Sequence, residues 1–180
     1  MEKILITGHT LTLEELAAVC RDNAPVALAP EAKQRILESR QVVDMLVDEA
    51  AVVYGITTGF GKFSDVIITQ DECRQLQRNL IVTHAVGAGD PFPRDVARGI
   101  MLLRVNNLAK GFSGTRLELV ETLVAMLNRG VTPVIPQKGS LGASGDLAPL
   151  SHMVLPMLGL GQAEYEGEVL PGDVAMERAG

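Results

Sequence analysis

Apolar residues recur every three or four positions along most of the chain, which is the spacing of one face of an α-helix. These stripes predict helices over residues 12–22, 30–51, 69–86, 93–110, 113–130 and 146–158, and a last helix from Asp173. Residues 3–7 form a short strand pattern that ends at Gly8, residues 23–30 are expected to be a connector, and residues 163–170 predict a small hairpin. We therefore expect a mainly α fold: a helical domain with a short N-terminal strand and a small β-hairpin near the C-terminus.

Polar residues mark several of the predicted helix starts. Thr12 with Glu15, and Thr69 with Glu72, have the spacing of a capping box, in which each side chain bonds the other residue's backbone N–H. Ser113 is expected to cap the helix of residues 113–130. These signals give the helices defined beginnings.

The composition restricts the core and the partners. The chain is 47% hydrophobic but only 3% aromatic and has no tryptophan, so the core must be aliphatic, which favours packed helices. A net charge of −6 without any basic cluster argues against a nucleic-acid surface. No apolar run reaches the roughly eighteen residues of a membrane span, and the first residues do not form a signal peptide. We expect a soluble, cytoplasmic protein that binds neither nucleic acid nor membrane.

The two cysteines lie in helical patterns far apart in the sequence. Cys20 and Cys73 lack the spacing of metal ligands, and nothing indicates a secretory context. Both are expected to be reduced core residues, and no metal site is predicted.

Residues 138–152 depart from the generic helical pattern. Pro149 has no N–H, so it belongs in the first turn of the helix that follows Gly145. With Asp146 as the N-cap, Pro149 takes the third helical position, and the carboxylate can accept from the exposed N–H groups of that turn. Residues 143–145, which are Ala-Ser-Gly, then lie just outside the helix and face its positive end.

An Ala-Ser-Gly segment in a tight loop permits unusual chemistry. The nitrogen of Gly145 has no bulky neighbour and can reach back to the Ala143 carbonyl if the loop bends sharply. Cyclisation with loss of water, followed by elimination of the Ser144 hydroxyl, would leave an exocyclic methylidene, an electrophile that ordinary side chains do not supply. The simpler alternative is that Ser144, Gly145 and Asp146 only cap a helix.

The stretch Gly139–His152, Gly-Ser-Leu-Gly-Ala-Ser-Gly-Asp-Leu-Ala-Pro-Leu-Ser-His, resembles the signature of the aromatic amino acid ammonia-lyases, and most of all that of the histidine ammonia-lyases. In that family the Ala-Ser-Gly triad becomes a methylidene-imidazolone group. The resemblance implies that residues 1–180 are a single N-terminal domain, truncated before the long central helical bundle of the family. It also implies a homotetramer whose active sites combine several subunits, with no metal.

Residues 54–61 contain three glycines and predict a sharply turned loop. The loop lacks the lysine of a phosphate-binding loop, so nucleotide binding is a weak alternative. The resemblance implies that Tyr54 is the base that removes a proton from the β-carbon of the substrate, with Gly61 in a supporting role. Without the resemblance, Tyr54 would be interpreted as a loop residue packed on the core.

His84 ends an apolar stripe of the predicted helix 69–86. By itself such a histidine is more often a hydrogen-bonded core residue than a functional one. The resemblance implies that Thr83 and His84 read the substrate side chain, at positions where histidine ammonia-lyases carry a Ser-His pair and phenylalanine lyases carry an apolar pair. Because histidine can hydrogen-bond an imidazole or a phenol, His84 favours a polar aromatic substrate.

Further supporting residues follow from the same resemblance. Asn106 belongs to a polar cluster, residues 104–107, that interrupts an apolar helix face; the alternative is a satisfied network that only fixes the helix. Asp146 and Leu147 follow the Ala-Ser-Gly triad directly and are expected to support it.

The resemblance implies elimination of ammonia from an aromatic α-amino acid, most simply L-histidine giving urocanate. The alternative within the family is a 2,3-aminomutase, which Thr57 keeps open because some bacterial aminomutases resemble the Thr-Thr-Gly version found here. A third hypothesis is a catalytically inactive helical fragment. We expect no turnover from the 180 residues alone, in which an unformed prosthetic group is the alternative to a formed one.

Overall fold

The computed structural model of the chain describes residues 3–58 and 70–180, with side chains at 70–74 left out. Its helices are α1 (Leu13–Asp22), α2 (Pro30–Asp48), α3 (Gln70–His84), α4 (Arg94–Leu108), α5 (Leu117–Arg129), α6 (Leu147–Val154) and α7 (Gly172–Ala179), with a 3-10 turn, η2 (Leu155–Leu158). Its strands are β1 (Ile4–Ile6), β2 (Val26–Leu28), β3 (Ala88–Pro91), β4 (Thr132–Pro133), β5 (Pro136–Lys138), β6 (Gln162–Tyr165) and β7 (Glu168–Pro171). The prediction of a mainly α fold with an N-terminal strand and a C-terminal hairpin is confirmed.

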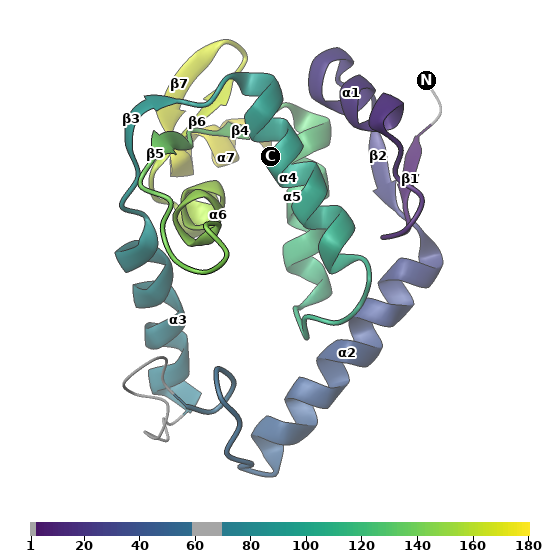
Figure 1. Cartoon of the computed structure of the whole chain (residues 1–180), viewed down its shortest axis with the longest axis vertical. Helices are drawn as coiled ribbons and strands as arrows, with labels where there is room; N and C mark the ends of the chain where they lie inside the picture. Colours follow the sequence, from purple (N-terminus) through teal and green to yellow (C-terminus); the bar gives the residue numbers. More distant parts are fainter. Residues whose placement is uncertain (1–2, 59–69) are drawn as a thin grey trace.

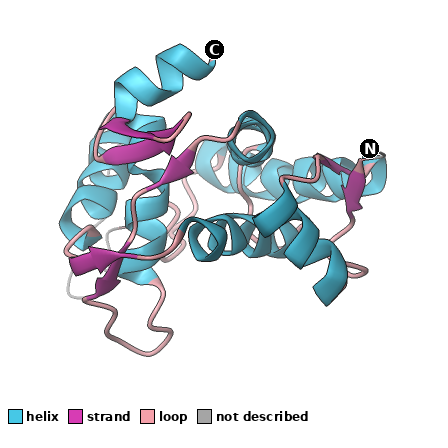
Figure 2. Cartoon of the chain, turned by 90° about the horizontal axis from the view of Figure 1, so that it is seen from above, coloured by secondary structure: helices cyan, strands magenta, loops and turns pink. Residues whose placement is uncertain are grey.

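The elements form a frame around two central helices. Figure 1 shows α4 and α5 side by side, with α1 and the β1–β2 pair on one side of them and the β6–β7 hairpin on the other. Helix α6 contacts both α3 and α4 and lies between them. In Figure 2 the N-terminal strand pair lies on one side of the molecule, and the other short strands lie towards the opposite side.

The helix ends agree with the sequence signals at some positions and not at others. Thr12 and Glu15 form the predicted capping box at the start of α1. The prediction that Ser113 caps the next helix is wrong, because α5 begins only at Leu117. Residues 113–114 pack on α2 instead: the Gly114 N–H donates to Ser39 Oγ at 2.9 Å, and a Cβ on Gly114 would lie 2.3 Å from Val43 Cγ2. The Thr69–Glu72 capping box lies outside the described residues.

The expected connector of residues 23–30 contains a strand that the sequence did not reveal. Strand β2 pairs in parallel with β1. Its Val26 also pairs with the side chain of Asn128: the Val26 N–H donates to Oδ1 at 2.8 Å, and Nδ2 donates to the Val26 carbonyl at 2.9 Å. Because a three-residue strand is too short to show alternation, its pairing comes from tertiary contacts.

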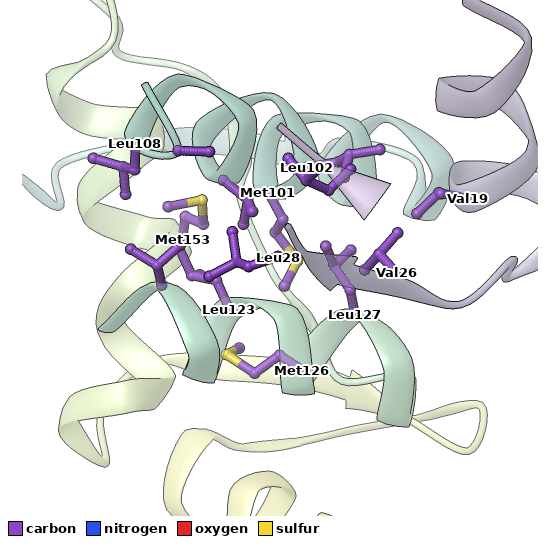
Figure 3. Close-up of a cluster of buried hydrophobic side chains, with 14 of the residues drawn as sticks. Val19, Val26, Leu28, Met101, Leu102, Leu108, Leu123, Met126, Leu127 and Met153 are labelled. Carbon is purple, nitrogen blue, oxygen red and sulfur yellow. The ribbon is translucent and has the colours of Figure 1, made fainter. Parts of the chain in front are cut away.

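The core is aliphatic, as the composition predicts. Figure 3 shows buried side chains from α1, β2, α4, α5 and α6 meeting between the two central helices. The fully buried members include Val19, Met101, Leu102, Leu123 and Met153. Cys20 is buried and free, as expected, whereas the side chain of Cys73 lies outside the described residues.

Arg98 of α4 is completely buried within this core. Its Nε and Nη2 donate to the Val19 carbonyl at 3.1 and 2.8 Å, and its Nη1 donates to the Leu127 carbonyl at 3.1 Å. Both carbonyls belong to the last turns of α1 and α5, where no intrahelical donor remains. Burial lowers the pKa of the Arg98 guanidinium, since water is excluded from the charge. A single cation thus joins three helices.

The C-terminal part combines a tight hairpin with a shortened helix. The β6–β7 turn places Glu166 and Gly167 at φ of 51° and 83°, which is the backbone of a type I′ turn. The predicted helix 146–158 is shortened as Pro156 suggested, because α6 ends at Val154 and continues as η2. Within residues 3–58 and 70–180, no helix has the length and apolar character needed to cross a membrane.

Replacing Arg98 with Met should destabilise the chain by about 3 kcal/mol, because two buried helix carbonyls would lose their donors. Urea unfolding followed by circular dichroism measures this loss. Arg21→Met is the matched control: the Arg21 side chain is 71% exposed and its ion pair with Asp95 is weak, so its loss should be below about 0.5 kcal/mol. Equal losses in the two variants would contradict the assigned role of Arg98.

Candidate active site

The loop between β5 and α6 carries the Ala-Ser-Gly triad. Gly139, Gly142 and Gly145 have φ of 109°, 104° and 71°, conformations that residues with a side chain rarely adopt. The chain therefore turns sharply several times within a few residues, and Ala143 and Ser144 are exposed at the turn. The predicted position of the triad, just outside a helix start, is confirmed.

Asp146 stands at the N-cap position of α6, but the prediction that its carboxylate caps the helix is wrong. Its backbone is already helical, with φ of −107° and ψ of −8°, whereas a capping side chain needs an extended backbone to reach the first-turn N–H groups. The carboxylate instead accepts a hydrogen bond from the Ser144 hydroxyl. Pro149 occupies the third helical position as predicted, and Leu147, the first helical residue, is exposed.

The residues of this loop fit the precursors of a methylidene-imidazolone. Gly145 has no side chain at the nitrogen that would close the ring, and its left-handed backbone belongs to a sharply bent segment. The hydroxyl of Ser144, which would have to leave, is bonded to a carboxylate that can exchange protons with it. These observations concern the chain before any ring is formed.

The end of α3 holds the two residues expected to read a substrate. The half-buried His84 places Nδ1 at 2.7 Å from the Leu80 carbonyl, and the exposed Thr83 donates its hydroxyl to the same carbonyl at 3.1 Å. Since a carbonyl only accepts, Nδ1 carries the proton, and Nε2 of the neutral ring is an acceptor. His84 is therefore anchored by one nitrogen and keeps the other for a partner that donates.

Two segments that are distant in the sequence meet beside Gly87, three residues after His84. We call this place the Gly87 junction; it comprises residues 86–88, 136–139 and His152. Strands β3 and β5 pair there, with Ala88 opposite Lys138. A Cβ on Gly139 would lie 3.1 Å from Gly87 Cα, so the two backbones are in direct contact. The junction thereby connects the end of α3 with the loop that carries Ser144.

His152 of α6 completes the junction, and sequence reasoning assigned it no role. Its Nε2 accepts the Gly87 N–H at 2.9 Å. Burial lowers the pKa of His152, which favours the neutral ring that this hydrogen bond requires. The histidine at the end of the motif was the available signal, but nothing in the sequence pointed to Gly87 as its partner.

Tyr54 lies on a different segment. It belongs to a turn of residues 54–57 after α2, and 62% of it is exposed. Figure 1 shows this turn between the lower ends of α2 and α3, beyond the loop that precedes α6. Gly61, expected to be a supporting residue of the site, lies outside the described residues.

Asn106 lies on α4, which contacts α6. Its Oδ1 is shielded from solvent and has no hydrogen-bond partner in the described part of the chain, so the alternative of a fully satisfied network does not hold for this atom. Among the described residues, no group of three or more His, Cys, Asp or Glu side chains is arranged to hold a metal ion.

Gly139→Ala should destabilise the chain by about 2 kcal/mol more than Gly142→Ala. Both glycines have a similar positive φ, so both variants carry the same backbone strain, but a Cβ at 142 meets nothing within 4 Å whereas one at 139 meets the Gly87 backbone. Urea unfolding of the two variants measures the difference. Equal losses would show that the contact at the Gly87 junction is not tight.

The lowered pKa of His152 predicts a loss of stability in weak acid. Its ordinary value is about 6.5, so as the pH falls below this value the unfolded chain binds a proton before the folded chain does. The contribution of His152 to the stability of the fold is fully present above this pH. It declines as the pH falls, until the pH is below the pKa of His152 in the folded chain. The free energy of unfolding is measured at about every half pH unit from pH 8 to pH 5. It should decline less in His152→Gln than in the unaltered chain. Identical slopes would contradict the prediction.

Several known proteins are similar to this chain in sequence or in fold. A histidine ammonia-lyase of Caldanaerobacter subterraneus subsp. tengcongensis is 59% identical over 180 residues, which are 100% of this chain and 35% of that protein. Ergothionase from Treponema denticola superposes with a TM-score of 0.94 at 32% identity, over 99% of this chain and 36% of that one. Phenylalanine aminomutase from Pantoea agglomerans superposes with a TM-score of 0.91 at 35% identity, over 99% and 34%.

This chain therefore spans about a third of the length of the curated relatives that it matches. Residues 11–180 match the family described as "Aromatic amino acid lyase", which is nearly the whole chain. The resemblance first noted for residues 139–152 thus extends to the helices that position this stretch. The chain belongs to the aromatic amino acid lyase family.

Proposed function

We propose that this chain is the N-terminal, prosthetic-group-bearing part of an ammonia-lyase that converts L-histidine to urocanate and ammonia. The observation that carries the proposal is the Gly87 junction, which connects the Ser144 loop with the end of α3 that carries His84. The 59% identity to a histidine ammonia-lyase supports histidine as the substrate.

Residues 143–145 are proposed to form the 4-methylidene-imidazol-5-one of the family. Once formed, this group supplies an electrophile at the start of α6. Asp146 holds the Ser144 hydroxyl in the unmodified chain. The N-terminal end of α6 favours negative charge beside the loop, since its first N–H groups have no intrahelical acceptors. Leu147 belongs to that same first turn. Asn106 of α4 is proposed as a further supporting residue of the site.

His84 supports a substrate side chain that donates a hydrogen bond. With its proton on Nδ1, the ring offers Nε2 as an acceptor. The imidazole of histidine has an N–H to donate, whereas the ring of phenylalanine has none, so an acceptor at His84 favours histidine over phenylalanine. Thr83, exposed beside His84, is proposed to complete this contact.

Tyr54 is proposed to take the proton from the β-carbon of the substrate, with Gly61 in support. The exposure of Tyr54 and of Ser144 supports a site that other segments complete in the assembled protein. We propose a cytoplasmic homotetramer for that assembly. Apolar side chains exposed along α2, among them Leu37, Val42 and Met45, are consistent with packing against further chain.

An aromatic amino acid 2,3-aminomutase is the second candidate, favoured by the likeness to the Pantoea agglomerans enzyme. In the sequence, Thr57 is the residue that keeps this alternative open. The Thr57 hydroxyl donates to the Ala51 carbonyl at 2.5 Å and accepts the Val53 N–H at 2.9 Å, so its bonds hold the turn that carries Tyr54. This local role weakens Thr57 as an indicator of aminomutase activity. Free ammonia as the product indicates the lyase, and a β-amino acid indicates the aminomutase.

The proposal predicts that the complete protein containing these residues has a mass short by two water molecules and forms urocanate from L-histidine. Ser144→Ala should have the mass calculated for the variant without any loss of water. Its rate should be lower by about a thousandfold or more, which is about 4 kcal/mol of transition-state stabilisation. Intact-mass spectrometry and urocanate absorbance measure the two effects.

Ser140→Ala is the matched control, because Ser140 lies in the same exposed loop but outside the Ala-Ser-Gly triad. This variant should keep the loss of two waters. An unmodified mass in the complete, unaltered protein, or turnover that survives Ser144→Ala, would refute the proposal.

A further inference from the structure

The three amides that follow His84 have different partners. The Ala85 N–H bonds back into α3, and the Val86 N–H donates to the His84 carbonyl at 2.9 Å. The Gly87 N–H is the first of them to leave the local chain, and its acceptor is His152 Nε2. The His84 carbonyl is therefore bonded to Val86, the residue directly before the one that donates to α6.

The space at this contact admits only glycine. A Cβ on Gly87 would lie 2.9 Å from His152 Nε2 and 3.0 Å from Pro136 Cβ. The chain at Gly87 is thus enclosed by the His152 ring on one side and by β5 on another, while Gly139 contacts it from the loop. Any movement of the ring or of this backbone is transmitted to the other, since the two are in direct contact.

The ring can make this bond in one state only. The amide donates, so Nε2 must be unprotonated and the proton of the neutral ring must be on Nδ1. Burial lowers the pKa of His152 and so favours the neutral ring over the charged one. His152 is consequently an acceptor placed where the chain just after α3 meets the helix that follows Ser144.

We propose that His152 is a positioning residue that holds the Thr83–His84 end of α3 in place relative to the start of α6, through the Gly87 N–H. This inference rests on the proposed function, because it concerns how the substrate side chain is held relative to the Ala-Ser-Gly loop. His152 acts through the Gly87 N–H, and it sets the distance between the Thr83–His84 pair and the Ala-Ser-Gly loop.

The test compares His152→Leu with His152→Gln in the complete protein. Leucine removes the acceptor, whereas the Gln carbonyl oxygen offers an acceptor near the former Nε2. The expected result for His152→Leu is a KM for L-histidine raised about tenfold with a smaller change in kcat, and full or nearly full recovery of KM in His152→Gln. His9→Leu, at an exposed histidine, is the matched control and should leave KM unchanged.

A second measurement does not depend on turnover. Amide hydrogen exchange over residues 84–88 should be faster in His152→Leu than in the unaltered protein and slow again in His152→Gln. If His152→Leu does not fold, Gly87→Ala takes its place, because its methyl group would push the ring away while the acceptor stays on α6. It should produce the same rise in KM and the same faster exchange.

These experiments distinguish a failure of the proposed function from a failure of the positioning role of His152. An unaltered protein that forms no product from any aromatic amino acid would refute the proposed function, while the exchange experiment would still test the role of His152. An active protein in which His152→Leu lowers only kcat, with KM and the exchange at residues 84–88 unchanged, would overturn the positioning role and leave the function intact.

Discussion

Short helices leave their last carbonyl groups without intrahelical donors, and burying such groups is costly unless donors are supplied. In this fold the Arg98 guanidinium supplies them to α1 and α5 at once. The charge itself lies in an aliphatic core, so its hydrogen bonds are what makes its burial tolerable. The relative placement of α1, α4 and α5, and with it the frame on which the candidate site is built, depends on this interaction.

The same principle recurs where the chain is irregular. Asn128 pairs with Val26 as a strand would, Arg35 donates to the Thr7 and Ala109 carbonyls, and Ser39 accepts from Gly114. In each case a side chain supplies the hydrogen bond that a short element cannot obtain from its own backbone. Such bonds fix the connections between helices, and a fold with short strands needs them because its sheets contribute few backbone pairs.

Side-chain hydrogen bonds also position the candidate site. Helix α6 is anchored on the core side by buried residues such as Met153 and at the Gly87 junction by His152. Its first turn is thereby held beside a loop in which Ser144 and Asp146 are exposed and bonded to one another. The buried side of α6 is the support, and the Ala-Ser-Gly triad lies at the surface. This arrangement keeps an exposed triad in a defined position relative to His84.

The sequence by itself determined the helical class, most helix ends, the aliphatic core and the Ala-Ser-Gly triad before α6, because these follow from local periodicity, proline and glycine chemistry and a long specific motif. It did not determine the β2 strand, the true start of α5 or the partner of Asp146, because each depends on contacts between residues far apart in the sequence or on a backbone angle that composition does not restrict. The roles of Tyr54, Thr83, His84, Gly61, Asn106 and Leu147 remain predictions from the resemblance. Only the tertiary structure brought Gly87 to His152, since a hydrogen bond between an ordinary backbone amide and a distant ring leaves no pattern in the sequence.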